Sequence, residues 1–542
     1  MKRYIAFCLS VLYLFSAVYA ADKASTVNIT IDTKQERTPI SPYIYGANQD
    51  VDGVVHPARR LGGNRMTGYN WETNASNAGS DWKHSSDYFM CDVYGISSID
   101  RYTPAAVISA FHEKSIEHKA YSAITLQMAG YVSKDTSGEV SESEKAPSNR
   151  WAQVKFKKDG KLSLNPDTKD NYVYMDELIN YLIKKYGDAS KTTGIKGYIL
   201  DNEPDLWAST HPRIHPQKTT CKELIEKSVE LSKVIKSLDP KAEVFGYTSY
   251  GFGGYLSLKD APDWNTVKGN HDWFISWYLE QMKKASDKFG KRLLDVLNLN
   301  WYSEARGNNL RINFDGAEDT SREVSIARMQ APRTLWDPTY KTDIKGQITN
   351  GEDSWINQWF PEYLPLIPKI KADIDKYYPG TKLAFTEFDY GGKNHISGGI
   401  ALTDVLGIFG KYGIYFATRW GDSGDYITAA YNIYLNYDGK GSKYGNTNVK
   451  AVSSDSANMP VYASINGNND SNLHLILINR NYDKKLTANI NIKNTKKYLK
   501  AEIYGFDSKS ADIKKVNAKI NIKNNICTLD VPPLTVYHLI LK

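Results

Sequence analysis

The sequence predicts an α/β protein, a (β/α)8 TIM barrel with an accessory antiparallel β-sandwich domain. Two observations carry this prediction. Between residues 41 and 436, eight short β-like runs alternate with longer segments of helical periodicity, as in a parallel sheet that closes into a barrel. From residue 437 onward, apolar and polar residues alternate and are separated by Asn, Asp and Gly turn signals, which is typical of a β-sandwich.

The first twenty residues have the pattern of a signal peptide. Lys2 and Arg3 precede an apolar run, and Val18-Tyr19-Ala20 ends it with a small-residue cleavage signal. We therefore expect residues 1–20 to be removed and the mature chain to be secreted and extracellular. No later segment is apolar for long enough to cross a bilayer, so no membrane association is expected.

Residues 21–40 precede the barrel pattern and alternate in the same way as the C-terminal strands. We expect this segment to pair with them, so that residues 21–40 plus 437–542 form the sandwich and residues 41–436 form the barrel.

The eight predicted barrel strands come in chain order, each followed by loop or helical sequence. They are residues 43–48, 58–64, 120–126, 197–200, 243–249, 296–302, 382–388 and 414–420. Two of the intervening helices are legible from their i, i+3, i+4 spacing: one from Met175 that stops at Gly187, and one over residues 224–238 before Pro240. No Gly-rich phosphate loop follows the first strand, which disfavours a nucleotide-binding fold.

Composition narrows the function classes. With 41% hydrophobic and 24% charged residues, the 542-residue chain is typical of a globular protein with a sizeable core. The 38 Tyr and 12 Trp exceed what packing alone usually requires, and exposed aromatic rings suit sugar rings. The net charge of +7 is spread along the chain, so no nucleic-acid partner is expected.

Three cysteines remain after the signal peptide, which contains Cys8. Cys91, Cys221 and Cys527 have no short spacing and form neither a disulfide framework nor a zinc motif, although a single bridge stays open.

A barrel carries its working residues at the C-terminal ends of its strands. Glu203 follows the fourth predicted strand and Glu387 lies at the end of the seventh, so both can point into one space. Two facing carboxyl groups are what glycoside hydrolysis requires, since one protonates the leaving oxygen and the other attacks or activates water. Asn202 is placed to bind a sugar hydroxyl, and Tyr302 to donate a hydrogen bond to Glu387.

Five stretches resemble glycoside hydrolase family 44. They are "RLGGNRMTGYNWETNASNAGSDWKHSSD" (60–87), "DNEPDLW" (201–207), "ARMQAPRTLWDPTY" (327–340), "EDSWI" (352–356) and "TEFDYGG" (386–392). The resemblance spans the whole mature chain. It implies a secreted endo-β-1,4-glucanase that acts by a retaining mechanism, with Glu203 as acid/base and Glu387 as nucleophile.

The resemblance also implies aromatic platforms for glucose, with Trp71, Trp336 and Trp420 as the matching residues. Together with residues near the strand ends, the expected substrate-binding set is Asn64, Tyr69, Trp71, Asn202, Trp207, Tyr302, Trp336 and Trp420.

One position departs from the family pattern. Strand six ends Asn300-Trp301-Tyr302, where the family pattern has His-Trp-Tyr. Asn donates a hydrogen bond but carries no charge, so a role for an imidazole at this strand end is in doubt, and we expect the main reaction not to depend on it.

No cofactor is expected for catalysis. Members of the family bind metal, so a structural calcium ion remains an alternative. Asp50 and Asp52 have the spacing of calcium ligands, but the distal Glu of a complete calcium-binding loop is missing.

We expect a monomer that acts on a β-1,4-linked polysaccharide such as cellulose or xyloglucan. The alternatives are a mannanase, xylanase or mixed-linkage glucanase on the same barrel, and a non-catalytic glycan-binding barrel.

Overall fold

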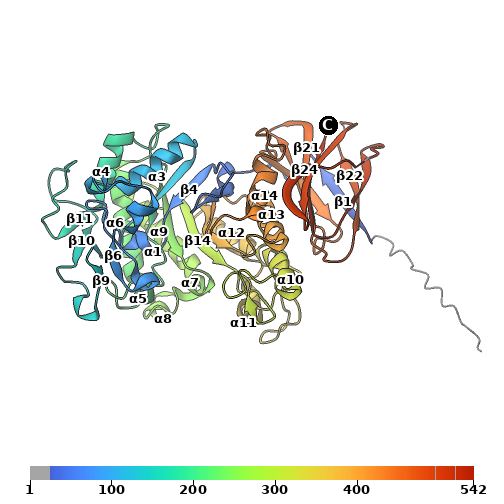
Figure 1. Ribbon diagram of the computed structural model, residues 1–542. Coiled ribbons are helices and arrows are strands. Elements are labelled where there is room, and N and C mark those ends of the chain that lie inside the picture. The colour runs from blue at the N-terminus through green and yellow to red at the C-terminus, as the bar shows by residue number, and fades with distance from the viewer. Residues whose placement is uncertain (1–24, 495, 519) are drawn as a thin grey trace, which may run out of the picture.

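The computed structural model describes residues 25–494, 496–518 and 520–542. The predicted signal peptide, residues 1–20, lies outside the described residues. The predicted fold is confirmed: eight parallel strands close into a barrel with helices around it, and a mostly antiparallel sheet adjoins the barrel (Figure 1).

The barrel strands match the eight predicted runs, with β17 ending one residue beyond its run, and every neighbouring pair is parallel. They are β3 (Gly46–Ala47), β4 (Ala58–Leu61), β7 (Tyr121–Leu126), β12 (Gly197–Leu200), β13 (Glu243–Ser249), β14 (Val296–Tyr302), β17 (Lys382–Asp389) and β18 (Phe416–Arg419). The first predicted strand was too long. Residues 42–45 form a 3-10 helix because Ser41 caps it and Pro42 fixes its first turn, which leaves two residues for β3.

The longer helices cover the outside of the barrel (Figure 1). They are α3 (Ala106–Glu117), α4 (Met175–Tyr186), α6 (Cys221–Leu238), α9 (Phe274–Phe289), α10 (Arg322–Gln330), α12 (Leu366–Tyr377), α13 (Ile396–Lys411) and α14 (Asp425–Leu435). Both predicted helices are confirmed. Gly187, with φ of +87°, ends α4, and α6 buries Leu224, Leu231 and Ile235 on one face.

Short elements build the loops of the barrel. The short helices are α1 (Asn64–Thr67), α2 (Phe89–Val93), α5 (Trp207–Thr210), α7 (Phe252–Ser257), α8 (Trp264–Val267) and α11 (Trp355–Trp359). The small strands are β5 (Ser76–Asn77), β6 (Ser85–Asp87), β8 (Tyr131–Ser133), β9 (Gly138–Glu139), β10 (Trp151–Lys155), β11 (Tyr172–Tyr174), β15 (Arg306–Gly307) and β16 (Leu310–Arg311).

The interior of the barrel is apolar near the start of its strands. Seven of the eight strands contribute to one buried cluster, made of Ala58, Tyr121, Ala123, Ile199, Phe245, Val296, Ala384 and Phe416. Because this cluster fills the N-terminal end of the barrel, the polar side chains at the C-terminal strand ends have space that opens to solvent.

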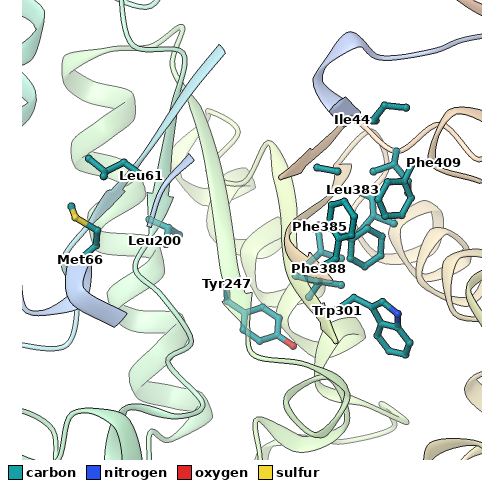
Figure 2. Packing of buried hydrophobic residues seen from close by; sticks show 14 of the residues in the cluster. Ile44, Leu61, Met66, Leu200, Tyr247, Trp301, Leu383, Phe385, Phe388 and Phe409 are labelled. Carbon is teal, nitrogen blue, oxygen red and sulfur yellow. The ribbon is translucent and has the colours of Figure 1, made fainter. Parts of the chain in front are cut away.

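A bulge in β17 aims Glu387 inward. Phe385 and Phe388 both pack on Phe409 of α13 outside the barrel, at ring separations of 5.4 and 5.3 Å (Figure 2). Residues three apart in a regular strand face opposite sides. The register between β14 and β17 shifts by one residue at Thr386, and this extra residue turns Glu387 toward the barrel axis.

The second unit is a ten-stranded sheet in which β1 (Ser25–Asp32) lies between β19 (Thr447–Ser453) and β22 (Leu486–Lys493). The other strands are β2 (Thr38–Pro39), β20 (Val461–Asn466), β21 (Asn469–Asn479), β23 (Ala501–Asp507), β24 (Ser510–Lys515), β25 (Ile526–Val531) and β26 (Thr535–Leu541). Residues from both ends of the sheet share one apolar core, so the sheet folds over itself.

One pair in this sheet departs from the antiparallel expectation, since β1 and β22 run parallel. The whole barrel separates them in sequence, so no hairpin fixes their relative direction.

Helices α13 and α14 lie between the barrel and the sheet (Figure 1). The approach is close, because a side-chain carbon on Gly407 would come within 2.3 Å of the Tyr462 ring. Asp404 and Arg480 form a fully buried ion pair of 3.1 Å across this interface, and the Tyr462 hydroxyl donates to Asp404 at 2.6 Å. The barrel and the sheet therefore pack closely and through specific polar contacts.

Cys91, Cys221 and Cys527 are buried and free. The single disulfide that the sequence allowed is therefore not formed. Within the described ranges, no helix is long and apolar enough to span a membrane.

Candidate active site

Glu387 is held from two sides at the C-terminal end of β17. Arg60 Nη1 donates to its Oε1 at 2.6 Å, and the Tyr302 hydroxyl donates to its Oε2 at 2.7 Å. The second contact is the hydrogen bond expected from the sequence. Each carboxylate oxygen therefore has its own donor, which fixes the orientation of the side chain.

Glu203 lies in the turn after β12, and its φ of +42° places it in the left-handed region. Its backbone N–H donates to the Thr248 carbonyl at 3.0 Å, and Asn300 Nδ2 donates to its Oε1 at 3.0 Å. Burial, followed by the negative charge of Glu387, raises the pKa of Glu203 well above its usual range. Both effects favour the protonated form of Glu203, which is the form that a general acid requires.

Arg60 connects the two halves of the site. Besides Glu387, its guanidinium donates to Asn202 Oδ1 at 2.6 Å and to Asn48 Oδ1 at 3.1 Å. Arg60 is fully buried in β4, where only a planar group with several donors can serve three acceptors. Strand-end positions do not single out Arg60, although a charged residue inside a buried β-run was a usable signal.

Both carboxyl groups line one cleft of about 460 Å³ at the C-terminal face of the barrel. The cleft continues into a second hollow of about 940 Å³, since Gly63, Asn64, Asp81 and Trp420 line both. A groove that extends past the two carboxyl groups suits a polymer that is cut within its chain.

Comparisons with known proteins agree with this geometry. A model of glycoside hydrolase family 44 matches residues 75–305. The crystal structure of a family 44 endoglucanase from Clostridium thermocellum is 55% identical, with a TM-score of 0.92, over 96% of this chain and 100% of that one. The chain belongs to glycoside hydrolase family 44.

Two further relatives are similar. A family 44 xyloglucanase from Paenibacillus polymyxa, solved with xyloglucan, is 52% identical with a TM-score of 0.92, over 96% of this chain and 100% of that one. The β-mannanase/endoglucanase A of Caldicellulosiruptor saccharolyticus is 75% identical over 508 residues, which are 94% of this chain. The chain spans 38% of the length of that relative.

Four of the expected substrate-binding residues of this family 44 chain line the cleft: Asn64, Asn202, Tyr302 and Trp420. Asn202 Nδ2 donates to Asn64 Oδ1 at 3.2 Å, and Asn64 Nδ2 donates to Asp81. The Trp420 ring packs over Gly63, where φ is +86° and an added side-chain carbon would come within 2.5 Å of the ring.

The expectation is wrong for Tyr69, Trp71 and Trp207, whose side chains are fully buried. Tyr69 donates to Asn74 and Trp207 donates to the Asn202 carbonyl, so both support the loops from beneath. A buried ring presents no face to a sugar.

The expectation is also wrong for Trp336. This residue lies at the junction of the barrel and the sheet, against Tyr412 and Lys411, and lines a separate crevice there.

Strand-end reasoning missed the exposed aromatic residues of the groove, because they lie on loops and short helices. They are Trp82 and Phe89 in the larger hollow, and Phe314 and Trp355 in the cleft beside the carboxyl groups. Trp82 is 64% exposed, far more than an aromatic residue of a core.

Asp205 is a half-buried carboxyl group that follows Glu203 by two residues. It accepts from the Ser249 hydroxyl at 2.5 Å and from the Tyr250 N–H at 3.2 Å, which ties the 203–207 turn to the end of β13. Burial raises the pKa of Asp205 to about 7, and its charge adds to the rise in the pKa of Glu203.

The calcium pattern at Asp50 and Asp52 does not fit a metal site. Both Asp50 oxygens bind Arg59 at 2.8 Å, and Lys114 also contacts it at 2.8 Å, so its charge is already neutralised. Among the described residues, no group of three or more His, Cys, Asp and Glu is arranged to hold a metal ion.

Proposed function

We propose that this chain is a secreted, retaining endo-β-1,4-glucanase that hydrolyses cellulose-type β-glucan and xyloglucan. One observation carries the proposal: two carboxyl groups line one open groove, where Glu387 has a donor on each oxygen and the pKa of Glu203 is raised well above its usual range. The names of the family 44 relatives as endoglucanase and xyloglucanase support it. Secretion rests on the pattern of residues 1–20 alone.

The reaction is a double displacement. Glu387 attacks the anomeric carbon while Glu203 gives its proton to the departing glycosidic oxygen, so that a glycosyl ester forms and the glycosidic bond breaks. Glu203, now a carboxylate, takes a proton from water, and this water releases the sugar and regenerates Glu387. Two carboxyl groups and water balance both steps, so the proposed chemistry requires no cofactor.

Arg60 and Tyr302 position Glu387 in both steps of this reaction. Their hydrogen bonds hold the Glu387 side chain in place for attack and then accommodate its return as the leaving carboxylate. Asn202, fixed by Arg60, lines the cleft, where its amide can bind a hydroxyl of the sugar ring at the scissile bond.

The test is product analysis on unbranched carboxymethylcellulose and on xyloglucan, with the first-formed anomer followed by proton NMR. Release of the β-anomer is expected, since two inversions restore the configuration. Release of the α-anomer overturns the retaining assignment, and failure to cut either polymer overturns the glucanase assignment.

Mannanase activity is the second candidate, because the Caldicellulosiruptor saccharolyticus relative is named β-mannanase/endoglucanase. A third arm with β-1,4-mannan separates the two, and a kcat/KM on mannan above that on both glucans favours the mannanase.

A further inference from the structure

We propose that Asn300 is a positioning residue that confines the acid proton of Glu203 to its Oε2 atom, the oxygen that Asn300 does not contact. This inference rests on the proposed function of Glu203 as the acid/base. It gives a task to the strand-six residue that the sequence left without one.

The hydrogen bond between the two side chains defines which oxygen can carry the proton. Asn300 Nδ2 lies 3.0 Å from Glu203 Oε1, and Asn300 itself is fully buried. An amide NH2 group donates and cannot accept. When Glu203 is protonated, Oε1 must therefore be the carbonyl oxygen, and the O–H must be on Oε2.

Thr386 contacts the oxygen of the Asn300 amide and supports the orientation in which Nδ2 faces Glu203. The Thr386 hydroxyl donates to Asn300 Oδ1 at 3.2 Å, so the amide oxygen is directed away from Glu203. Thr386 is the bulge residue of β17 and is fully buried. The same bulge therefore turns Glu387 inward and supplies the hydroxyl that orients Asn300.

The backbone of Asn300 is held as well. The Tyr255 hydroxyl donates to the Asn300 carbonyl, and Asn300 is the register partner of Glu387 across β14 and β17. Asn300 thus pairs with Glu387 through the backbone of the sheet and contacts Glu203 through its side chain.

The side chain of Asn300 is a neutral amide, so its hydrogen bond to Glu203 does not depend on pH as that of an imidazole would. The ionisable groups that face Glu203 are Glu387 from β17, Asp205 from its own turn, Arg60 from β4, Tyr302 from β14 and Tyr255 from α7. Because Asn300 does not titrate, the donor to Oε1 stays in place at every pH at which the enzyme works.

The consequence for the reaction concerns both steps. In the first step the proton leaves from Oε2 to the glycosidic oxygen, and in the second step Oε2 recovers it from water. If the donor to Oε1 is lost, the proton distributes over both oxygens, and the part of the population with the proton on Oε1 is unproductive. Loss of the donor also destabilises the carboxylate form of Glu203.

The experiment compares Asn300→Ala with wild type on aryl β-cellobiosides whose leaving groups need different degrees of acid assistance. A phenyl glycoside is expected to lose about tenfold in kcat/KM, and a 2,4-dinitrophenyl glycoside less than about threefold, since that leaving group departs without a proton. The alkaline limb of kcat/KM is expected to move to higher pH by up to about one unit. Equal losses on both glycosides with an unmoved limb overturn the proposal.

A second pair of variants tests the orientation without touching Asn300. Thr386→Val keeps the shape but frees the amide to turn, and is expected to move the limb in the same direction. Thr386→Ser keeps the hydroxyl and is expected to restore the wild-type limb. A Val variant with the wild-type limb and leaving-group dependence overturns the assigned role of Thr386 and the fixed orientation with it.

Wild-type hydrolysis of the same glycosides is measured in parallel. Absence of wild-type hydrolysis overturns the proposed function, whereas normal wild-type hydrolysis with unaffected variants overturns the assignment of Asn300 alone.

Discussion

Arg60 Nη1 lies 2.6 Å from Glu387 Oε1, and the same buried guanidinium also holds Asn202. One residue of β4 therefore holds both Glu387 on β17 and Asn202, which precedes Glu203 in the turn after β12. The two halves of the site are thus linked by the hydrogen bonds of a single side chain.

Arg60→Lys tests this bridge. Lys retains the charge but cannot reach three acceptors with a planar fork, so we expect kcat to fall about 10- to 100-fold. Arg59→Lys is the matched control, since Arg59 is the preceding residue of β4 and binds Asp50 and the backbone of α3. Its variant is expected to lower Tm and to leave kcat within about threefold. Equal kcat losses in both variants contradict the role of Arg60.

Glu387→Gln removes the proposed nucleophile without changing the size of the side chain. Turnover is expected to fall at least about 10³-fold while calorimetry still detects cello-oligosaccharide binding. Glu243→Gln is the control: Glu243 begins β13 at the opposite end of the barrel and accepts from Tyr121 and Tyr415. Its loss should lower Tm and spare kcat. Near-normal turnover in Glu387→Gln excludes Glu387 as the nucleophile.

Asp205→Asn tests whether the charge of Asp205 raises the pKa of Glu203. In the proposed mechanism, activity requires protonated Glu203 and is expected to fall as pH rises through the pKa of Glu203, and the charge of Asp205 raises that pKa. Removing the charge is expected to move the alkaline limb of kcat/KM to lower pH by a few tenths to about one unit. Asp81→Asn, which alters a cleft carboxylate that contacts Asn64, is expected to leave the limb in place. A limb that moves upward in Asp205→Asn refutes the electrostatic account.

Substitutions of Trp420 and Trp336 compare a ring that lines the groove with a ring that lies outside it. Trp420→Ala is expected to raise KM on cello-oligosaccharides about tenfold, because the ring lines the groove beside Glu387. Trp336→Ala is expected to lower Tm with KM unchanged, because the ring packs between the barrel and the sheet. If KM rises in Trp336→Ala and stays constant in Trp420→Ala, the assignment of the two rings is reversed.

His474 predicts the acid sensitivity of the fold. His474 and His538 are buried in the sheet with ring nitrogens 3.0 Å apart, and burial lowers the pKa of His474 to about 4. The folded state keeps His474 neutral while the unfolded chain binds a proton below about pH 6.5. Stability from this group is therefore present above about pH 6.5 and is lost as pH falls toward about 4, by up to about 3 kcal/mol.

Urea unfolding at about pH 7, 5.5 and 4.5 measures this loss. His474→Leu is expected to flatten the decline in the free energy of unfolding over the same pH range. A variant whose decline parallels that of wild type assigns the acid sensitivity to other groups.

The misplaced aromatic residues share one physical cause. Periodicity identifies which residues leave a strand at its C-terminal end, and this was enough to find Glu203 and Glu387. It does not indicate whether a Trp in the following loop turns outward like Trp82 or inward like Trp71, because loop side chains follow no fixed period.

The sequence by itself determined the barrel, the adjoining β-unit and the two carboxyl groups, because strand and helix periods and strand ends are local properties of the chain. Only the tertiary structure decided how these groups are held. The bulge at Thr386 that aims Glu387, the reach of Arg60 across the barrel and the contact of Asn300 with Glu203 join residues 86 to 327 positions apart or depend on register between strands. Such contacts form only when the sheet closes, and no local pattern encodes them.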